Sequence, residues 1–275
     1  MIGLVHLVWA PLGLGPLQRF LRSYHAHPGG IEHELTIVLN GARVSDPDGE
    51  SSRDRLLAEL EGTDYRLIEP EEPVLDLPAY GIAARTLGHA RLCFLNSHSV
   101  ILADGWLRAL SRALDEPDVG LVGATASWES QAEWVRGRAL YWAYQLAGVR
   151  AARRDYPRFP NPHIRTTGFM VERDTLLDMN LQAAVDKPAT YLLESGHDSV
   201  TRRIWNRGEK TLVVGRNGVS YDVEQWPSGR AFRSGGQENL LIADNRTRDW
   251  DESSPRLRRR LSRDAWGSAA VGLQA

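Results

Sequence analysis

The first 128 residues alternate short apolar runs with stretches of helical periodicity, and this alternation restricts the fold more than any other feature. The apolar runs occupy residues 2–9, 33–41, 65–72, 90–97 and 119–127. Between them, helical spacing predicts helices over residues 17–27, 53–60, 76–87 and 105–114. Strands that alternate with helices are typical of a doubly wound, mostly parallel sheet. We therefore expect an α/β fold with a twisted sheet flanked by helices.

The second half of the sequence predicts further elements of the same kind. Residues 164–179 resemble a strand that enters a helix, and residues 210–218 predict another strand and turn. A helix is expected to begin near residues 196–199 and to end at Gly208. No internal repeat or low-complexity linker interrupts the chain. We expect a single domain with a C-terminal extension.

The composition excludes several classes of protein. The 275 residues carry 33 basic and 35 acidic side chains, and this balance disfavours a dedicated nucleic-acid binder. A single cysteine, Cys93, excludes a disulfide scaffold and a multi-cysteine zinc site, and it suits a reducing cytoplasm. No glycine-rich phosphate loop of the dinucleotide-binding or Walker type follows a predicted strand, which disfavours those enzymes.

The sequence predicts a cytoplasmic protein. No run of ~20 apolar residues is present to form a transmembrane helix, and the apolar start has no basic residues of the kind that open a signal peptide. The segment RLRRRLSR at residues 256–263 is strongly basic. It is either the solvated end of a helix or a peripheral contact with an anionic membrane surface.

Polar residues follow several predicted strands directly. Pro11, Asn40, Glu69 and the run Asn96-Ser97-His98 all stand at such strand ends. In open α/β sheets, ligands bind beyond the carboxyl ends of the strands. These positions are therefore the first candidates for function.

Three runs resemble the GT-A fold of nucleotide-sugar glycosyltransferases, and family 2 most closely. They are CFLNSHSVILADGWLRAL at residues 93–110, RTTGFMVERD at residues 165–174, and LLESGHDSVTRRIWNRGEKTLVV, which ends at Val214. The resemblance implies a nucleotide-sugar-binding half at residues 1–128 and an acceptor-binding, catalytic half of the same domain at residues 129–220. Residues 221–275 would form the C-terminal extension.

The family's Asp-x-Asp motif is replaced here by Asn96-Ser97-His98. In the family, one carboxylate of this motif orients the ribose and another ligates Mn²⁺ or Mg²⁺. Asn96 can still hydrogen-bond a ribose hydroxyl, with Ser97 beside it in the donor site. His98 can ligate a divalent metal, and an imidazole favours Mn²⁺ over Mg²⁺. Alternatively, His98 binds the pyrophosphate in a metal-independent enzyme.

The resemblance places the catalytic carboxylate of an inverting transferase on Asp198. Such a base takes the proton of the attacking hydroxyl. Asp198 also stands at a predicted helix start, where an aspartate is a common N-cap. Glu194 is the second candidate for the base. His197 occupies a position where a carboxylate is usual, and we assign it to the acceptor site.

Further residues are assigned to the two substrate sites by the same resemblance. Thr166 and Thr167 are expected to form the floor of the acceptor pocket. The aromatic residues between Trp128 and Trp142 either stack on sugars or belong to the core. The nucleotide-sugar site is expected to include, besides the Asn-Ser-His run, Pro11, Asn40, Glu69, Asp76, Tyr80 and Arg85.

The resemblance therefore implies a glycosyltransferase of polysaccharide biosynthesis that moves a sugar from a nucleotide-activated donor to a hydroxyl acceptor. The acceptor would be a glycan, a lipid-linked sugar or a small metabolite. One alternative is a catalytically silent protein that keeps the fold to bind a glycan or a protein partner. A nucleotidyltransferase is disfavoured, because the loop GLGPLQRF after the first strand lacks a lysine for phosphate.

Overall fold

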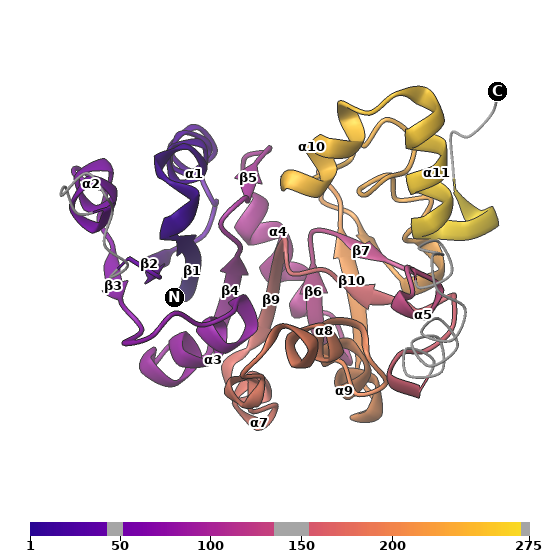
Figure 1. Cartoon of the computed structure of the whole chain (residues 1–275), viewed down its shortest axis with the longest axis horizontal. Helices are drawn as coiled ribbons and strands as arrows, with labels where there is room; N and C mark the ends of the chain where they lie inside the picture. The colour runs from indigo at the N-terminus through magenta and orange to yellow at the C-terminus, as the bar shows by residue number, and fades with distance from the viewer. Residues whose placement is uncertain (43–51, 135–153, 271–275) are drawn as a thin grey trace, which may run out of the picture.

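The computed structural model describes residues 1–42, 52–134 and 154–270. In this part of the chain the main sheet has eight strands, in the order β11–β10–β6–β9–β4–β1–β2–β3 (Figure 1). The strands are β1 (Ile2–Trp9), β2 (His33–Asn40), β3 (Arg66–Ile68), β4 (Arg91–Leu95), β6 (Val119–Gly123), β9 (Gly168–Glu172), β10 (Lys210–Val214) and β11 (Ser220–Tyr221).

The sheet is mostly parallel. Strands β1, β2, β3 and β4 pair in parallel, as do β6 and β10. Strand β9 runs antiparallel between β4 and β6, and β11 runs antiparallel at the edge. The predicted α/β fold with a mostly parallel sheet is confirmed.

Helices cover both faces of the sheet (Figure 1). The apolar cluster on one face contains residues of α1 (Leu14–Ala26), α2 (Ser52–Glu59) and α4 (Trp106–Leu114). The cluster on the other face contains residues of α3 (Asp76–Thr86), α7 (Arg173–Asp178) and α9 (Val200–Asn206). Successive strand residues point to opposite faces, so β4 sends Cys93 to the first cluster and Phe94 to the second. Burial on both faces explains why these strands are continuously apolar.

Short elements rise beyond the carboxyl edge of the sheet. Strand β5 (Val100–Ile101) pairs with β12 (Ile242–Ala243), and β7 (Ala126–Ser127) pairs with β8 (His163–Ile164). The short helix α5 (Gln131–Trp134) follows β7, and α8 (Lys187–Ser195) precedes α9. Helices α10 (Asn245–Asp251) and α11 (Pro255–Trp266) follow β12. Four 3₁₀ turns complete the described residues: η1 (Ala10–Leu12), η3 (Leu181–Ala183), η4 (Val223–Gln225) and η5 (Gly267–Ala269).

The C-terminal extension belongs to the same core as the sheet. Trp226, Phe232 and Trp266 are fully buried, and they pack in one cluster with residues of β4 and β9. The indole nitrogen of Trp266 donates to the carbonyl oxygen of Phe232 at 2.7 Å. Residues 221–270 therefore continue the domain rather than lying beside it.

The structure differs from the predicted elements in several places, and the short strands β5, β11 and β12 were not expected. Helix α8 was not expected, and the strand expected from residue 164 is divided into β8 and β9 by Arg165, Thr166 and Thr167. The loop expected at residues 43–52 lies almost entirely outside the described residues. Among the helices that are described, none is both long and apolar enough to cross a membrane.

Candidate active site

The carboxyl ends of the central strands meet the beginning of β9 at one edge of the sheet. Trp9 at the end of β1 lies opposite Asn40 at the end of β2, and Leu95 at the end of β4 lies opposite Gly168. Because β9 runs antiparallel to β4, its first residues lie at the same edge as the last residues of β4. Asn96 is thereby brought close to the residues that precede Gly168.

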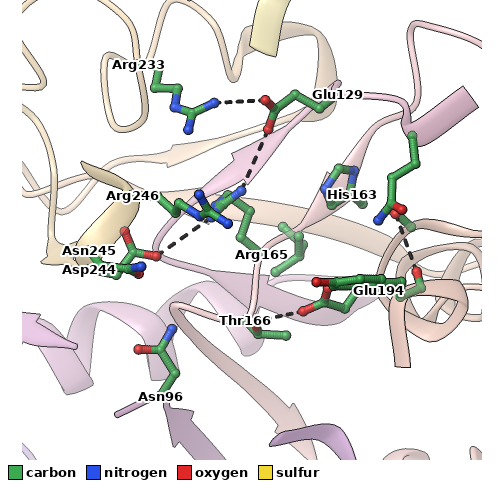
Figure 2. Close-up of a pocket in the computed structure, with 14 residues that line it drawn as sticks. Asn96, Glu129, His163, Arg165, Thr166, Glu194, Arg233, Asp244, Asn245 and Arg246 are labelled. Carbon is green, nitrogen blue, oxygen red and sulfur yellow. Dashed lines mark hydrogen bonds and ion pairs between the residues drawn. The ribbon is translucent and has the colours of Figure 1, made fainter. Parts of the chain in front are cut away.

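A cavity of about 400 Å³ opens above this edge. Asn96 and Thr166 lie at its base, and Glu194 from α8 forms one wall (Figure 2). Further lining residues come from β8, from the start of α10 and from the segments around them: Glu129, Gln131, His163, Ile164, Arg165, Tyr191, Ser195, Arg233, Asp244, Asn245 and Arg246. Its position agrees with the rule that α/β sheets bind ligands beyond their strand ends.

The loop after β4 is held by hydrogen bonds from its own side chains. The side-chain oxygen of Asn96 accepts from the backbone N–H of His98 at 2.8 Å and from the Ser99 hydroxyl at 3.2 Å. Ser97 is buried, and its hydroxyl accepts from the backbone N–H of Trp9 at 3.0 Å. These bonds fix the Asn96 oxygen within the loop and direct its amide nitrogen toward the cavity (Figure 2).

Glu194 is a carboxyl group adapted to proton transfer near neutral pH. It lies in the last turn of α8, where its Oε1 accepts from the Thr166 hydroxyl at 3.0 Å. Burial and the neighbouring Asp76 carboxylate raise the pKa of Glu194 to about 7, against the opposing effects of Thr166 and nearby arginines. A carboxylate with this pKa can accept a proton from a hydroxyl group.

Buried charges join the C-terminal segment to the cavity wall. Glu129 forms an ion pair with Arg233 at 2.8 Å, and Arg165 lies 3.8 Å from Glu129 and 3.7 Å from Asp244. Asp244 also accepts from the Thr167 hydroxyl at 2.6 Å. Although burial opposes it, Arg165 and these hydrogen bonds hold the pKa of Asp244 below its usual range. Asp244 is therefore ionised at neutral pH.

The residues around His98 fit a phosphate group better than a divalent metal. Burial, Arg248 and Arg19 lower the pKa of His98, and Arg248 donates weakly to the His98 carbonyl oxygen at 3.4 Å. The His98 Nδ1 atom is buried and has no hydrogen-bond partner among the described residues. Asp244, one of the two carboxylates whose charge acts on His98, already accepts from Thr167. Within residues 1–42, 52–134 and 154–270, no three His, Cys, Asp or Glu side chains gather in one place.

Two predicted donor residues hold loops in place. Both amide atoms of Asn40 bond the backbone of Val74, at 2.6 and 3.1 Å. Glu69 accepts a bidentate pair of hydrogen bonds from Arg53, at 2.9 and 2.8 Å. In this structure the hydrogen-bonding groups of both side chains are therefore paired with other protein groups.

The other predicted donor residues lie at different depths. Pro11 is exposed in η1, and Arg85 is exposed and donates to Asn180 at 3.1 Å. Asp76 is half-buried at the start of α3, where its charge acts on Glu194. Tyr80 is fully buried and packs against Phe94, with ring centroids 4.8 Å apart. The structure thus places Tyr80 in the core.

His197 and Asp198 lie outside the cavity. They are exposed in the turn between α8 and α9, and they line a separate, more open hollow with Met179. Asp198 forms an ion pair with Arg203 at 2.7 Å. The N-cap of α9 is Ser199, so Asp198 does not have the capping role that its position suggested.

The aromatic segment is described only in part. Trp128 packs edge-on against Trp266, with ring centroids 5.7 Å apart, and its neighbours belong to the core. Residues 135–153, with Tyr141 and Trp142, lie outside the described residues.

Five charged residues of the cavity were not expected: Glu129, Arg165, Arg233, Asp244 and Arg246. A local signal existed for Asp244, because Asp244 and Thr247 have the spacing of a capping box, which forms at the start of α10. Glu129 and Arg233 are 104 residues apart in the sequence. No local pattern could have paired them.

No family model matches the sequence, and no curated protein is significantly similar to it. Similar solved structures include a mannosyltransferase from Pyrobaculum calidifontis in complex with GDP-mannose and Mn²⁺. The two are 14% identical over 84% of this chain and 59% of that chain, with a TM-score of 0.47.

Two further solved structures have similar values. GalNAc-T7 with UDP, GalNAc and Mn²⁺ is 15% identical over 82% of this chain and 44% of that chain, with a TM-score of 0.49. Glucosyl-3-phosphoglycerate synthase from Mycobacterium tuberculosis, with Mn²⁺, UDP and phosphoglyceric acid, is 14% identical over 64% and 56%, with a TM-score of 0.39. This chain spans 44–59% of the length of these three chains, and at such identities the likeness concerns the fold alone.

Proposed function

We propose that this chain is an inverting glycosyltransferase that transfers a sugar from a nucleotide-activated donor to a hydroxyl group. One observation carries the proposal. The cavity brings Asn96, at a strand end where the donor is expected, together with Glu194, a carboxyl group whose pKa is about 7. A cavity that joins a donor position to a general base has the two parts that this reaction requires.

In the proposed reaction, Glu194 accepts the proton of the acceptor hydroxyl group. The hydroxyl oxygen forms a bond to the anomeric carbon while the bond from that carbon to the diphosphate oxygen breaks. Attack from the opposite side inverts the anomeric centre, and the nucleoside diphosphate leaves with the bonding electron pair. Thr166 holds one oxygen of Glu194, which leaves the other oxygen for the proton.

We assign the diphosphate to the surroundings of His98. Arg19 and Arg248 both lie close enough to act on the His98 imidazole, and guanidinium groups neutralise phosphate oxygens through charge-assisted hydrogen bonds. The Asn96 amide is placed to bond the ribose or the sugar. This assignment favours the metal-independent form of the mechanism over ligation of Mn²⁺ by His98.

Nucleotide binding is the first test of the proposal. A ligand present at about 100 times its dissociation constant stabilises a protein by about 2.7 kcal/mol. We expect one of UDP, GDP and dTDP to raise the melting temperature, and the matching nucleotide sugars to be hydrolysed slowly or transferred. A protein that none of the three nucleotides stabilises would instead fit the catalytically silent alternative.

We also propose that the protein is cytoplasmic and contacts membranes peripherally through α11. Arg256, Arg259, Arg260 and Arg263 are all exposed on this helix. Such a basic surface attracts anionic lipids. Sedimentation with phosphatidylserine vesicles should retain the protein at low salt and release it at high salt, because screening weakens the attraction.

A further inference from the structure

Cationic groups exceed ionised carboxylates in the cavity. Arg165, Arg233 and Arg246 all line it, whereas the carboxylates Glu129 and Asp244 contact only Arg165 and Arg233. Glu129 and Arg233 bond each other directly. Asp244 lies 3.7 Å from Arg165, and it already accepts from the Thr167 hydroxyl.

Arg165 lacks hydrogen-bond acceptors for its guanidinium group. The side chain is 18% exposed, and its two carboxylate contacts, at 3.7 and 3.8 Å, are longer than hydrogen bonds. Its Nε atom is buried without a partner in the described part of the chain. The guanidinium carbon lies 4.3 Å from the centre of the Phe232 ring, which supports it from one side. A buried donor left in this state indicates a missing acceptor.

Arg246 supplies a second guanidinium group. Its side chain forms no ion pair or hydrogen bond with any residue that the structure describes, and its charge acts on both Glu194 and Arg233. Figure 2 shows Arg165 and Arg246 together at the centre of the cavity. Paired guanidinium groups are the usual protein ligands of carboxylate and phosphate oxygens.

We propose that Arg165 and Arg246 bind a carboxylate or phosphate group of the acceptor, so that the acceptor is an anionic molecule. Calling this molecule the acceptor rests on the proposed function. The donor diphosphate is assigned to other cations, Arg19 and Arg248 beside His98, and Arg248 contacts the His98 carbonyl oxygen. Residues two apart on a helix, such as Arg246 and Arg248, do not face each other. An anionic group held there would lie within reach of Glu194, as a bound acceptor must.

Inorganic phosphate is the probe, measured by calorimetry on the whole protein saturated with the nucleoside diphosphate that binds. We expect Arg246→Gln to weaken phosphate binding about tenfold or more, since hydrogen bonds to charged groups are worth about 1.5–3 kcal/mol. Arg246→Lys should recover part of the affinity. Arg256→Gln, which removes the same charge from α11, should bind phosphate as the parent does.

Two outcomes would overturn the proposal. The first is phosphate affinity that Arg246→Gln leaves unchanged. The second is phosphate that binds only without the nucleotide and is displaced by it, which would assign these arginines to the donor diphosphate. If no nucleotide binds, the proposed function fails, and the same titration in an Arg248→Gln background still decides whether Arg246 holds an anion.

Discussion

At the scale of single residues, burial decides which carboxyl group can act as a base. Glu194 is half-buried in the cavity wall, where the Asp76 carboxylate of α3 acts on it, whereas the Asp198 side chain is 72% exposed and paired with Arg203. Water stabilises an exposed carboxylate and keeps it a weak base, whereas burial raises the pKa. The resemblance made both residues candidates for the base. Of the two, only Glu194 lines the cavity.

Replacement of the proposed base should remove turnover without removing nucleotide binding. In Glu194→Gln the side-chain oxygen can still accept from Thr166, but no group remains to take the proton. We expect turnover to fall by about 10²–10⁴-fold, with nucleotide affinity nearly unchanged. Asp198→Asn is the matched control and should keep most of its activity. A loss with Asp198→Asn that exceeds the loss with Glu194→Gln would return the base to Asp198.

The pH dependence of kcat/KM should report the ionisation of Glu194. A base works when deprotonated, so kcat/KM should rise with pH through about 7 and then level off. Asp76→Asn removes a neighbouring negative charge, which lowers the pKa of Glu194 and moves the midpoint to lower pH. Thr166→Val removes a hydrogen bond that favours the ionised form, so the midpoint should move to higher pH. Midpoints that coincide in all three proteins would mean that another group titrates.

Removal of divalent metal tests the environment of His98. If Arg19 and Arg248 neutralise the diphosphate, turnover should persist in excess EDTA, and Arg248→Gln should weaken nucleotide binding by about tenfold, or about 1.4 kcal/mol. Calorimetry with the nucleoside diphosphate measures this directly. Activity that disappears in EDTA and returns with Mn²⁺ more than with Mg²⁺ would support His98 as a metal ligand.

At the scale of elements, the sequence predicted the long strands of the main sheet, but not helix α8 or the short strands β5, β11 and β12. Buried strands such as β1 and β4 are apolar throughout, and that pattern depends only on neighbours in the sequence. Helix α8 was missed because only Thr190 and Ser195 are fully buried on it, so it lacks a strong apolar stripe. Its start carries a recognisable signal, since Asp186 caps the helix and Pro188 follows.

The site could be predicted only in part, because a sequence pattern reports on neighbouring residues and not on contacts between distant segments. Asn96 and Thr166 adjoin strands, and their meeting follows from the sheet topology. The direction of β9 is not encoded by its own pattern, because buried parallel and antiparallel strands have similar compositions. The positions of the five unexpected charged residues of the cavity depend on contacts between segments far apart in the sequence, such as that of Thr167 with Asp244.

The cap of α8 should contribute measurably to stability. The Asp186 carboxylate accepts from the backbone N–H of Ala189 at 2.8 Å. Asp186→Ala should lower the free energy of unfolding by about 1 kcal/mol, whereas Asp186→Asn should be nearly neutral because asparagine caps equally well. Urea denaturation compares the two. Equal losses in both variants would show that charge, rather than the cap, is responsible.

At the scale of the whole molecule, the C-terminal extension is joined to the sheet by apolar packing and by a buried ion pair. Trp226 and Phe232 complete the core on one face, and the Arg233–Glu129 pair lies beside them with side chains 8% and 10% exposed. Loss of one member of a buried pair leaves an uncompensated charge. We therefore expect the extension to stabilise the domain, and its Arg233, Asp244 and Arg246 line the cavity.

Breaking that pair should destabilise the entire domain. Arg233→Met should cost about 3–5 kcal/mol, because Glu129 would remain buried without its partner, and Glu129→Leu combined with Arg233→Met should recover most of the loss. Arg260→Gln removes an arginine from an exposed pair on α11 and should cost less than about 1 kcal/mol. Urea denaturation of the three variants and the parent compares their free energies of unfolding. A double variant no more stable than Arg233→Met would show that the arginine acts through packing alone.

Because β5 pairs with β12, which is much later in the sequence, this part of the structure can form only late in the synthesis of the chain. Ribosomes extend a chain from its amino terminus at about 5–20 residues per second, and domains fold as their segments emerge. Strand β5 and the Asn96 loop emerge early, but β12, Asp244 and Arg246 follow every strand of the main sheet. The growing chain therefore contains every strand of the main sheet before Asp244 and Arg246 of the cavity are synthesised, and we expect the cavity to bind a ligand only after α10 has been made.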